Sequence, residues 1–154
     1  MLVSRRQLLS LGVAGTSALG LARSSLGASA AVAGTAGGKP SIVLIHGAWQ
    51  GGWGWNKVVP LLWAAGHSTT TPTLSGMGER RNVPPSASGL QVHVDDIVAH
   101  MEMQDLSNVV LVGHSYGGCV LSGVLARQTG RVAHAIYLDA YVPRMGEGII
   151  TCLL

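Results

Sequence analysis

The sequence contains little charge, and the charge that it has is unevenly placed. Only 11% of the 154 residues are Asp, Glu, Lys or Arg, and no acidic residue occurs before Glu79. Three of the ten cations lie in the first 30 residues, which leaves seven cations and seven carboxylates in the remainder. A formally neutral remainder gives no electrostatic reason to expect nucleic acid as a partner.

Cysteine is also scarce, because the sequence has only Cys119 and Cys152. No pair of Cys or His residues has the spacing of zinc ligands, so we expect neither a metal site nor a cofactor. Cys119 falls in a predicted buried helix and is interpreted as a small apolar core residue. A disulfide between the two cysteines stays open as an alternative.

The first 30 residues predict an export signal. The pair Arg5 and Arg6 precedes an uncharged stretch at 8–22, and small residues suited to cleavage follow at 28–30 and 31–33. Paired arginines before a mildly apolar segment resemble a twin-arginine signal, which delivers a folded protein outside the cytoplasmic membrane. The uncharged stretch is shorter than the about 20 residues that a membrane-spanning helix needs, so we expect the signal to be cleaved. A signal that is retained as a membrane anchor is the alternative. We interpret residues 31–39 as a flexible linker.

Residues 40–154 are predicted to form part of one α/β domain. Continuous apolar runs at 42–45 and 109–112 indicate strands buried on both faces, as in a parallel sheet covered by helices. Weaker strands are expected at 68–73 and 133–138. Helices are expected at 90–104, at 118–128 and, after a turn, from about Pro60. This alternation predicts about four parallel strands with three crossover helices.

The residues that suggest chemistry follow the strand at 109–112 directly. Gly113-His114-Ser115-Tyr116-Gly117 matches the pattern G-x-S-x-G, and a predicted helix begins immediately after it. In this context the serine lies on a sharp turn at the carboxyl end of the sheet, and the flanking glycines leave room for strand and helix to pass closely. Ser115 is therefore the candidate nucleophile, with the N-terminus of a helix beneath it to favour negative charge.

A second loop, HGAWQGGW at residues 46–53, follows the first strand. Acyl transfer needs two backbone donors for the oxyanion, one after the nucleophile and one from a neighbouring loop. Tyr116 is the first candidate and Ala48 the second. We interpret Trp53 and Trp55 as cover for the loop, whereas a substrate contact by Trp49 stays open.

Together these residues identify a family resemblance. The chain resembles the N-terminal core of the α/β-hydrolase superfamily in four segments: SIVLIHGAWQGGWGW, TPTLSGMGERRN, GLQVHVDDIVAHMEMQDLSNVVLVGHSYGG and AIYLDAYVP. It is most similar to the branch of cofactor-free esterases related to plant salicylate methyl-esterases and hydroxynitrile lyases. The resemblance implies that the strand before His46 lies beside the strand before Ser115, at the switch point where such sheets bind ligands. It also implies Ser115 as nucleophile and Ala48 and Tyr116 as oxyanion donors.

The chain departs from that family after the elbow. The family carries its triad acid and histidine on later strands and loops, whereas the last histidine here is His134, at the start of the last predicted strand. His134 is expected far from Ser115, so we expect the catalytic histidine to be missing from this chain and the chain to be incomplete or inactive as it stands. Asp139, at the carboxyl end of its strand, is a weaker candidate for the triad acid.

The other histidines have structural interpretations. His46 and His114 are expected to shape their loops by hydrogen bonding. Solvent exposure is expected for His67, His93 and His100, and Asp95, Asp96 and Glu102 are expected to form the polar face of the helix at 90–104.

Two classes of function follow. One is a serine hydrolase acting on small carboxylic esters, with Ser115 as nucleophile. The other is a non-catalytic remnant or small-molecule binding module, and a lyase of the same branch is a further alternative. Self-association is expected through the open edge of the last strand, residues 133–138.

Overall fold

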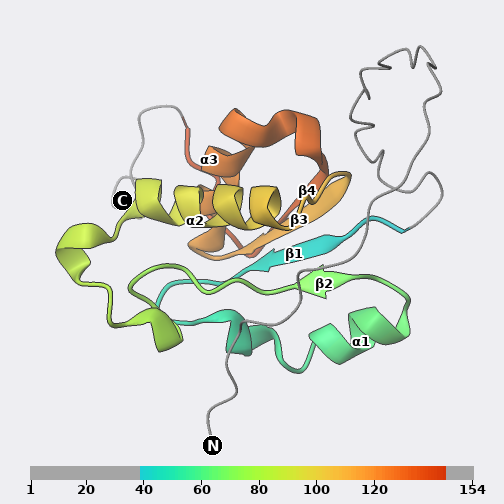
Figure 1. Ribbon diagram of the computed structural model, residues 1–154, viewed down its shortest axis with the longest axis horizontal. Coiled ribbons are helices and arrows are strands. Elements are labelled where there is room, and N and C mark those ends of the chain that lie inside the picture. Colours follow the sequence, from blue (N-terminus) through green and yellow to red (C-terminus); the bar gives the residue numbers. More distant parts are fainter. Residues whose placement is uncertain (1–38, 145–154) are drawn as a thin grey trace, which may run out of the picture. The chain divides into compact units, whose positions relative to one another are not determined.

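The computed structural model describes residues 39–144 (Figure 1). The predicted export signal, all of the predicted linker except Lys39, and Cys152 lie outside these residues. Within the described part, no helix has the length and hydropathy of a membrane span.

The described residues form a parallel sheet in the order β2-β1-β3-β4. The strands are β1 (Ile42–Ile45), β2 (Thr69–Thr70), β3 (Val109–His114) and β4 (Val132–Leu138). Chain order reverses between β1 and β3, where Ile45 lies opposite Gly113. The predicted neighbours are therefore confirmed, and the loops that follow both strands leave the same end of the sheet.

Helices cover both faces of the sheet, and the predicted α/β class is confirmed. In Figure 1, α2 (Leu90–Met103) and α3 (Gly117–Gln128) lie on one side and α1 (Val59–Ala64) lies on the other. Short 3₁₀ helices occupy Gly52–Trp55, Gly78–Arg80, Pro85–Ala87 and Thr129–Arg131. The three expected crossover helices are thus present, and α1 has proline in its first turn as predicted.

The core lies between the sheet and the pair α2 and α3. All of β1 is buried, and the face of α2 that carries Val94, Ile97, Val98 and Met101 packs against it together with residues of α3. Cys119 is 2% exposed in this core, as expected for a small apolar residue. By contrast α1 buries none of its residues and leaves Leu61 and Trp63 exposed.

The strand expected at 68–73 is much shorter than predicted. Only Thr69 and Thr70 pair with β1. Pro72 has no backbone N–H for a sheet hydrogen bond. Beyond it, the hydroxyl of Thr73 and the backbone N–H of Leu74 bond to Gly52 and His46 instead of extending the strand. The segment thus becomes a loop that is bonded to the chain that follows β1.

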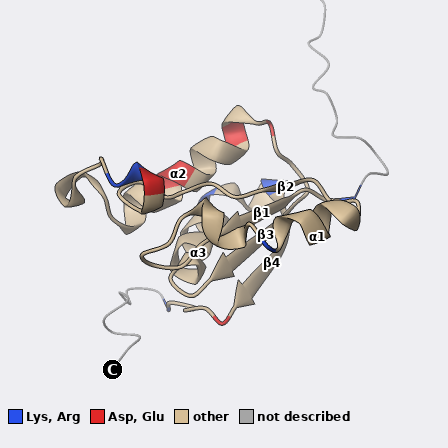
Figure 2. Cartoon of the chain, turned by 90° about the horizontal axis from the view of Figure 1, so that it is seen from below, with Lys and Arg blue, Asp and Glu red and all other residues tan. Residues whose placement is uncertain are grey.

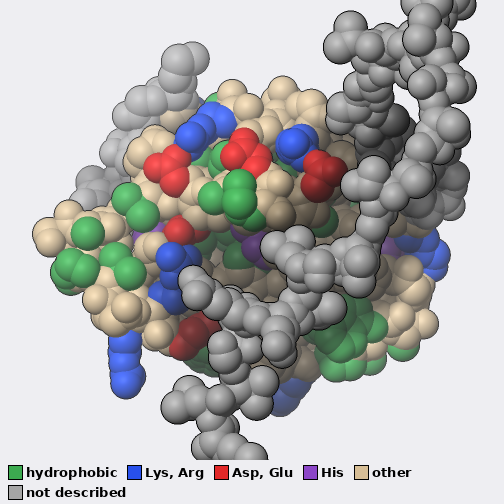
Figure 3. All heavy atoms as spheres, viewed as in Figure 1, with side chains coloured by type: hydrophobic (Ala, Val, Ile, Leu, Met, Phe, Trp, Pro, Cys, Tyr) green, Lys and Arg blue, Asp and Glu red, His purple; other side chains and the backbone are tan. Residues whose placement is uncertain are grey.

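Charged side chains lie mainly on the outer faces of the helices. Acidic residues gather on α2 (Figure 2), and cations and anions alternate on the surface over α2 and α3 (Figure 3). Arg127 pairs with Asp95, and Arg131 lies 3.4 Å from Asp105. The polar role expected for Asp95 is confirmed, and Glu102 is likewise exposed and bonded to Gln128 at 2.7 Å.

β4 is one of the two edge strands of the sheet that the structure describes. It pairs with β3 alone, and its apolar side chains Ile136 and Leu138 are 47% and 46% exposed. An edge of this kind offers unpaired N–H and C=O groups and an apolar surface to another chain.

Candidate functional site

The predicted elbow forms between β3 and α3. β3 ends at His114, α3 begins at Gly117, and Ser115 between them has φ +52°. A left-handed conformation is uncommon for a residue other than glycine, and such strain of about 1–3 kcal/mol concentrates at functional sites. Ser115 is partly exposed on this turn. The sequence prediction of its local geometry is therefore confirmed.

The glycines on either side of the elbow are required by close backbone contacts. A Cβ atom at Gly113 would lie 2.5 Å from the carbonyl oxygen of Gly117. A Cβ atom at Gly117 would lie 2.7 Å from the carbonyl oxygen of Ile45 and 2.9 Å from that of His46. Because both residues lack a Cβ atom, the first turn of α3 can lie directly against β3 and the end of β1.

Backbone hydrogen bonds hold the peptide groups of Ser115. Its N–H donates to the carbonyls of Leu138 and Asp139, at 3.3 and 3.2 Å. Its carbonyl accepts from the N–H groups of Gly118 and Tyr141, at 3.0 and 3.1 Å. The Ser115 carbonyl and the Tyr116 N–H belong to one planar peptide, so these two bonds also fix the direction of the predicted oxyanion donor.

The loop after β1 lies directly against the elbow. A Cβ atom at Gly47 would lie 3.2 Å from Cβ of Ser115. The Gly47 carbonyl accepts a hydrogen bond from Nδ1 of His46 at 2.7 Å. Because Gly47 C=O and Ala48 N–H share one planar peptide, this bond fixes the direction of the second predicted donor.

His46 is completely buried, and both of its ring nitrogens are used. Nδ1 carries the proton, since a carbonyl can only accept, and Nε2 accepts from the backbone N–H of Leu74 at 3.0 Å. Burial lowers the pKa of His46 below its ordinary value. The expectation that His46 shapes its loop by hydrogen bonding is confirmed, and this ring has no free nitrogen to act as a base.

Two cavities meet at Ser115. The larger, of about 880 Å³, is lined by Ala48, Trp49, Ser115 and Tyr116 among others, so the candidate nucleophile and the residues of both predicted donors border one cavity. Trp49 is 94% exposed and has φ +60°. Trp55 instead packs edge-on against His114, with ring centroids 6.2 Å apart, as expected for cover of the loop.

The smaller cavity, of about 300 Å³, brings the triad-acid candidate beside the elbow. It is lined by His114, Ser115, Asp139, Ala140 and Tyr141. Asp139 follows β4 and has φ +43°. His134 pairs with Val110 near the opposite end of the strands, as the sequence predicts, and so does not approach Ser115.

The expectations for His93 and Asp96 are wrong. His93 is 4% exposed, with Nδ1 2.7 Å from the Tyr116 hydroxyl and Nε2 2.9 Å from the Ser75 carbonyl. Asp96 accepts from both the N–H and the hydroxyl of Ser75, at 2.6 and 2.9 Å, and pairs with Arg80 at 3.1 Å. Helical spacing could have indicated His93, because it follows Leu90 by three residues on the apolar face of α2.

The remaining histidines of α2 and its surroundings are only partly exposed. His100 bonds to the Thr70 hydroxyl at 2.9 Å, and burial lowers its pKa. His67, before β2, is also half-buried. Full solvent exposure is therefore wrong for both. In the part of the chain that the structure describes, no group of three His, Cys, Asp or Glu side chains could hold a metal ion.

The sheet order, the strained serine and the adjoining loop match a known family. The model of the Alpha/beta hydrolase family matches residues 42–151. The chain belongs to this family. Among curated proteins, this alpha/beta hydrolase is 40% identical over 113 residues to a carbendazim-hydrolysing esterase of Nocardioides, covering 73% of this chain and 47% of that protein. It is 39% identical over 106 residues to salicylic acid-binding protein 2 of Nicotiana tabacum, covering 66% and 39%.

Solved structures give the same relationship. An extracellular alpha/beta-hydrolase from a Paenibacillus species, described as homologous in structure and function to the tobacco protein, superimposes with a TM-score of 0.64 at 28% identity. The match covers 69% of this chain and 43% of that one. This alpha/beta hydrolase chain thus spans less than half the length of the relatives that it matches.

Proposed function

We propose that this alpha/beta hydrolase is a serine esterase for small carboxylic esters and that Ser115 is its nucleophile. The main support is the strained conformation of Ser115 between two close-packed glycines, at a cavity that also contains Ala48 and Tyr116. The family membership and the esterases among the relatives support the same chemistry.

In the proposed reaction, Ser115 Oγ attacks the ester carbonyl carbon while a general base takes the hydroxyl proton. The carbonyl electron pair moves to the oxygen, and the N–H groups of Ala48 and Tyr116 stabilise the resulting oxyanion. Collapse of this intermediate breaks the bond to the alkoxy group, which receives the proton and leaves as an alcohol. Water then hydrolyses the acyl-serine to the carboxylic acid and regenerates Ser115.

We propose that the base is a histidine that this 154-residue sequence does not contain. All six histidines of the chain lie among the described residues. His46 and His93 use both ring nitrogens, and His134 lies toward the far end of β4. His114 lines the small cavity, but it directly precedes Ser115 on the turn and its ring packs against Trp55. The small cavity beside Ser115 and Asp139 is the space from which such a base would reach the serine.

The full chain can be tested with a fluorophosphonate probe and mass spectrometry. We expect slow labelling of Ser115, because an oxyanion hole retains about 10³–10⁴-fold catalysis without a complete triad. Added imidazole should accelerate the labelling by substituting for the absent base. Ser115→Ala should abolish both effects, and Ser107→Ala, which alters an exposed serine, should change neither.

The second candidate is a non-catalytic binding protein with the same cavity, favoured by the occupied nitrogens of His46 and His93. A folded chain that stays unlabelled with imidazole present, yet binds an ester analogue in calorimetry, would refute the esterase and support the binding protein.

We also propose export through the twin-arginine pathway, based on the sequence of residues 4–22. Fractionation of cells that express the full chain tests this. Replacement of Arg5 and Arg6 by lysine should retain the protein in the cytoplasm, and unchanged export would refute the proposal.

A further inference from the structure

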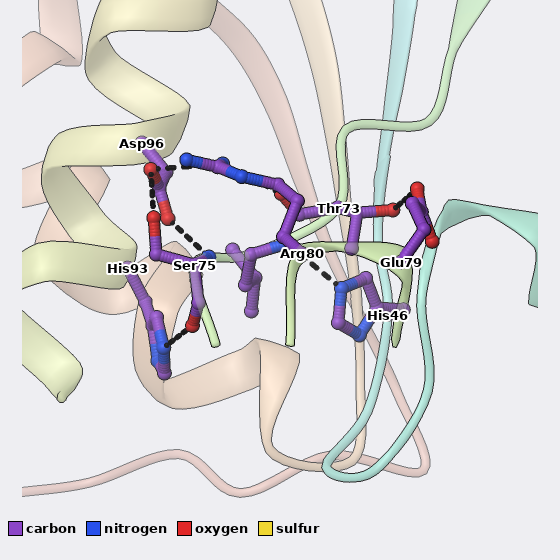
Figure 4. Close-up of polar contacts among 8 residues, drawn as sticks. His46, Thr73, Ser75, Glu79, Arg80, His93 and Asp96 are labelled. Carbon is purple, nitrogen blue, oxygen red and sulfur yellow. Dashed lines mark hydrogen bonds and ion pairs between the residues drawn. The ribbon is translucent and has the colours of Figure 1, made fainter. Parts of the chain in front are cut away.

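Two buried histidines approach one short segment of chain from opposite sides (Figure 4). His46 follows β1 and His93 lies on α2, and the segment between them is Leu74–Ser75 in the loop after β2. His46 accepts the N–H of Leu74, and His93 donates to the carbonyl of Ser75. The two rings therefore meet neighbouring residues of the same backbone.

Hydrogen bonding defines the roles of both His93 nitrogens. Nε2 must carry a proton because the Ser75 carbonyl can only accept, so in the neutral ring Nδ1 accepts from the Tyr116 hydroxyl at 2.7 Å. Burial raises the pKa of that hydroxyl to about 12, which keeps it protonated. The rings of His93 and Tyr116 also pack edge-on, with centroids 5.6 Å apart. The side chain of Tyr116 is thus anchored to α2.

The Leu74–Ser75 segment is itself firmly held. Leu74 is completely buried, and Asp96 binds both the N–H and the hydroxyl of Ser75. Arg80 donates to Asp96 at 3.1 Å and to the Thr73 carbonyl at 2.8 Å. A buried segment with this many polar contacts keeps its position, so a side chain that bonds to it is held in place as well.

Each proposed donor of the oxyanion hole is connected to the Leu74–Ser75 segment by hydrogen bonds. The Ala48 N–H is connected through the Gly47 carbonyl and His46, and Tyr116 is connected through its hydroxyl and His93. We propose that His93 is a positioning residue which, acting through Tyr116 and the Leu74–Ser75 segment, holds the two oxyanion donors at a fixed separation. This inference rests on the proposed esterase function.

The test measures the maximal rate of phosphonylation of Ser115 and the probe concentration at half of that rate. Tyr116→Phe removes the hydroxyl, and His93→Gln keeps a donor for Ser75 but places no acceptor at the position of Nδ1. Each should lower the maximal rate about tenfold, less than the about 10²–10³-fold for complete loss of an oxyanion donor, with little change in the half-saturating concentration. The double variant should be no slower than either single variant.

His93→Asn is the complementary variant, because its side-chain oxygen takes the position of Nδ1 but no donor remains for the Ser75 carbonyl. It should therefore lower the maximal rate as His93→Gln does, with little change in the half-saturating concentration. The matched control is His100→Gln on the same helix, which should react like the unaltered chain. Thermal melting verifies that each variant is folded. An unchanged rate in folded Tyr116→Phe, or in either folded His93 variant, would overturn the positioning role.

If the unaltered chain does not react at all, the proposed function fails, and nuclear magnetic resonance decides the positioning role separately. We then expect the backbone amide signals of Tyr116 and Ala48 to shift in His93→Gln but not in His100→Gln. Signals that stay unchanged in His93→Gln would overturn the inference.

Discussion

Gly117→Ala should disturb both the stability of the chain and its reactive site. The new methyl group would lie 2.7 Å from the carbonyl oxygen of Ile45 and 2.9 Å from that of His46. A comfortable carbon-to-oxygen contact is about 3.3 Å. The start of α3 and the end of β1 must therefore separate by about 0.6 Å.

The expected loss of unfolding free energy is about 1–2 kcal/mol. Overpacking by one methyl group costs about 1–3 kcal/mol, and the better helix propensity of alanine offsets up to about 1 kcal/mol. The same displacement moves the Ala48 loop away from Ser115 by more than the about 0.5 Å that an organised site tolerates. We therefore expect the fluorophosphonate labelling rate to fall about tenfold.

Urea denaturation and labelling kinetics measure the two effects. Gly130→Ala is the matched control, because a Cβ atom there would meet nothing within 4 Å. If Gly117→Ala equals Gly130→Ala in both stability and labelling rate, the close contact between α3 and β1 does not constrain the site, and the reasoning is refuted.

Three further predictions concern separate features. The pKa of His46 is lowered by burial, so below pH 6.5 the unfolded chain binds a proton that the folded chain resists. The unfolding free energy should therefore decrease as the pH is lowered below 6.5, by at most about 1.4 kcal/mol per pH unit for this group, and a urea series in which His46→Gln keeps the full slope would contradict this. The pKa of Tyr116 is raised to about 12, so its phenolate absorbance should be absent from an ultraviolet titration of the folded chain at pH 10.5, and Tyr116→Phe should leave the remaining titration at that pH unaltered. The exposed edge strand β4 should promote self-association, which Ile136→Lys should reduce and Val142→Lys, beyond the strand, should not; sedimentation velocity that detects only monomer of the unaltered chain would count against this.

Much of the fold follows from local patterns in the sequence. The continuous apolar runs identify β1 and β3, and the spacing of Leu90, Val94 and Ile97 identifies α2. The elbow at Ser115 was also predictable, because a G-x-S-x-G pattern between a buried strand and a helix admits few other conformations.

The contacts that lie behind the elbow were not predictable in the same way. His93 and Asp96 belong to α2, but their partners Tyr116 and Ser75 are distant in sequence and come together only when the layers pack. A polar residue on a helix is exposed by default, and only a partner contributed by another element makes its burial favourable. The strand predicted at 68–73 was too long for the same reason. Threonine-rich sequence favours a strand, but Pro72 lacks a backbone N–H and Thr73 bonds to Gly52, which is distant in sequence.

The backbone contacts of Ser115 have a consequence for the order in which the protein matures. The serine turn is closed by Leu138, Asp139 and Tyr141, which a ribosome adds well after the turn itself. β3 and α3 can therefore assemble before these residues emerge, yet the Ser115 turn gains its final backbone support only once the chain beyond β4 has folded back. A nascent polypeptide would thus carry an incompletely supported serine turn until residues 138–141 have been added.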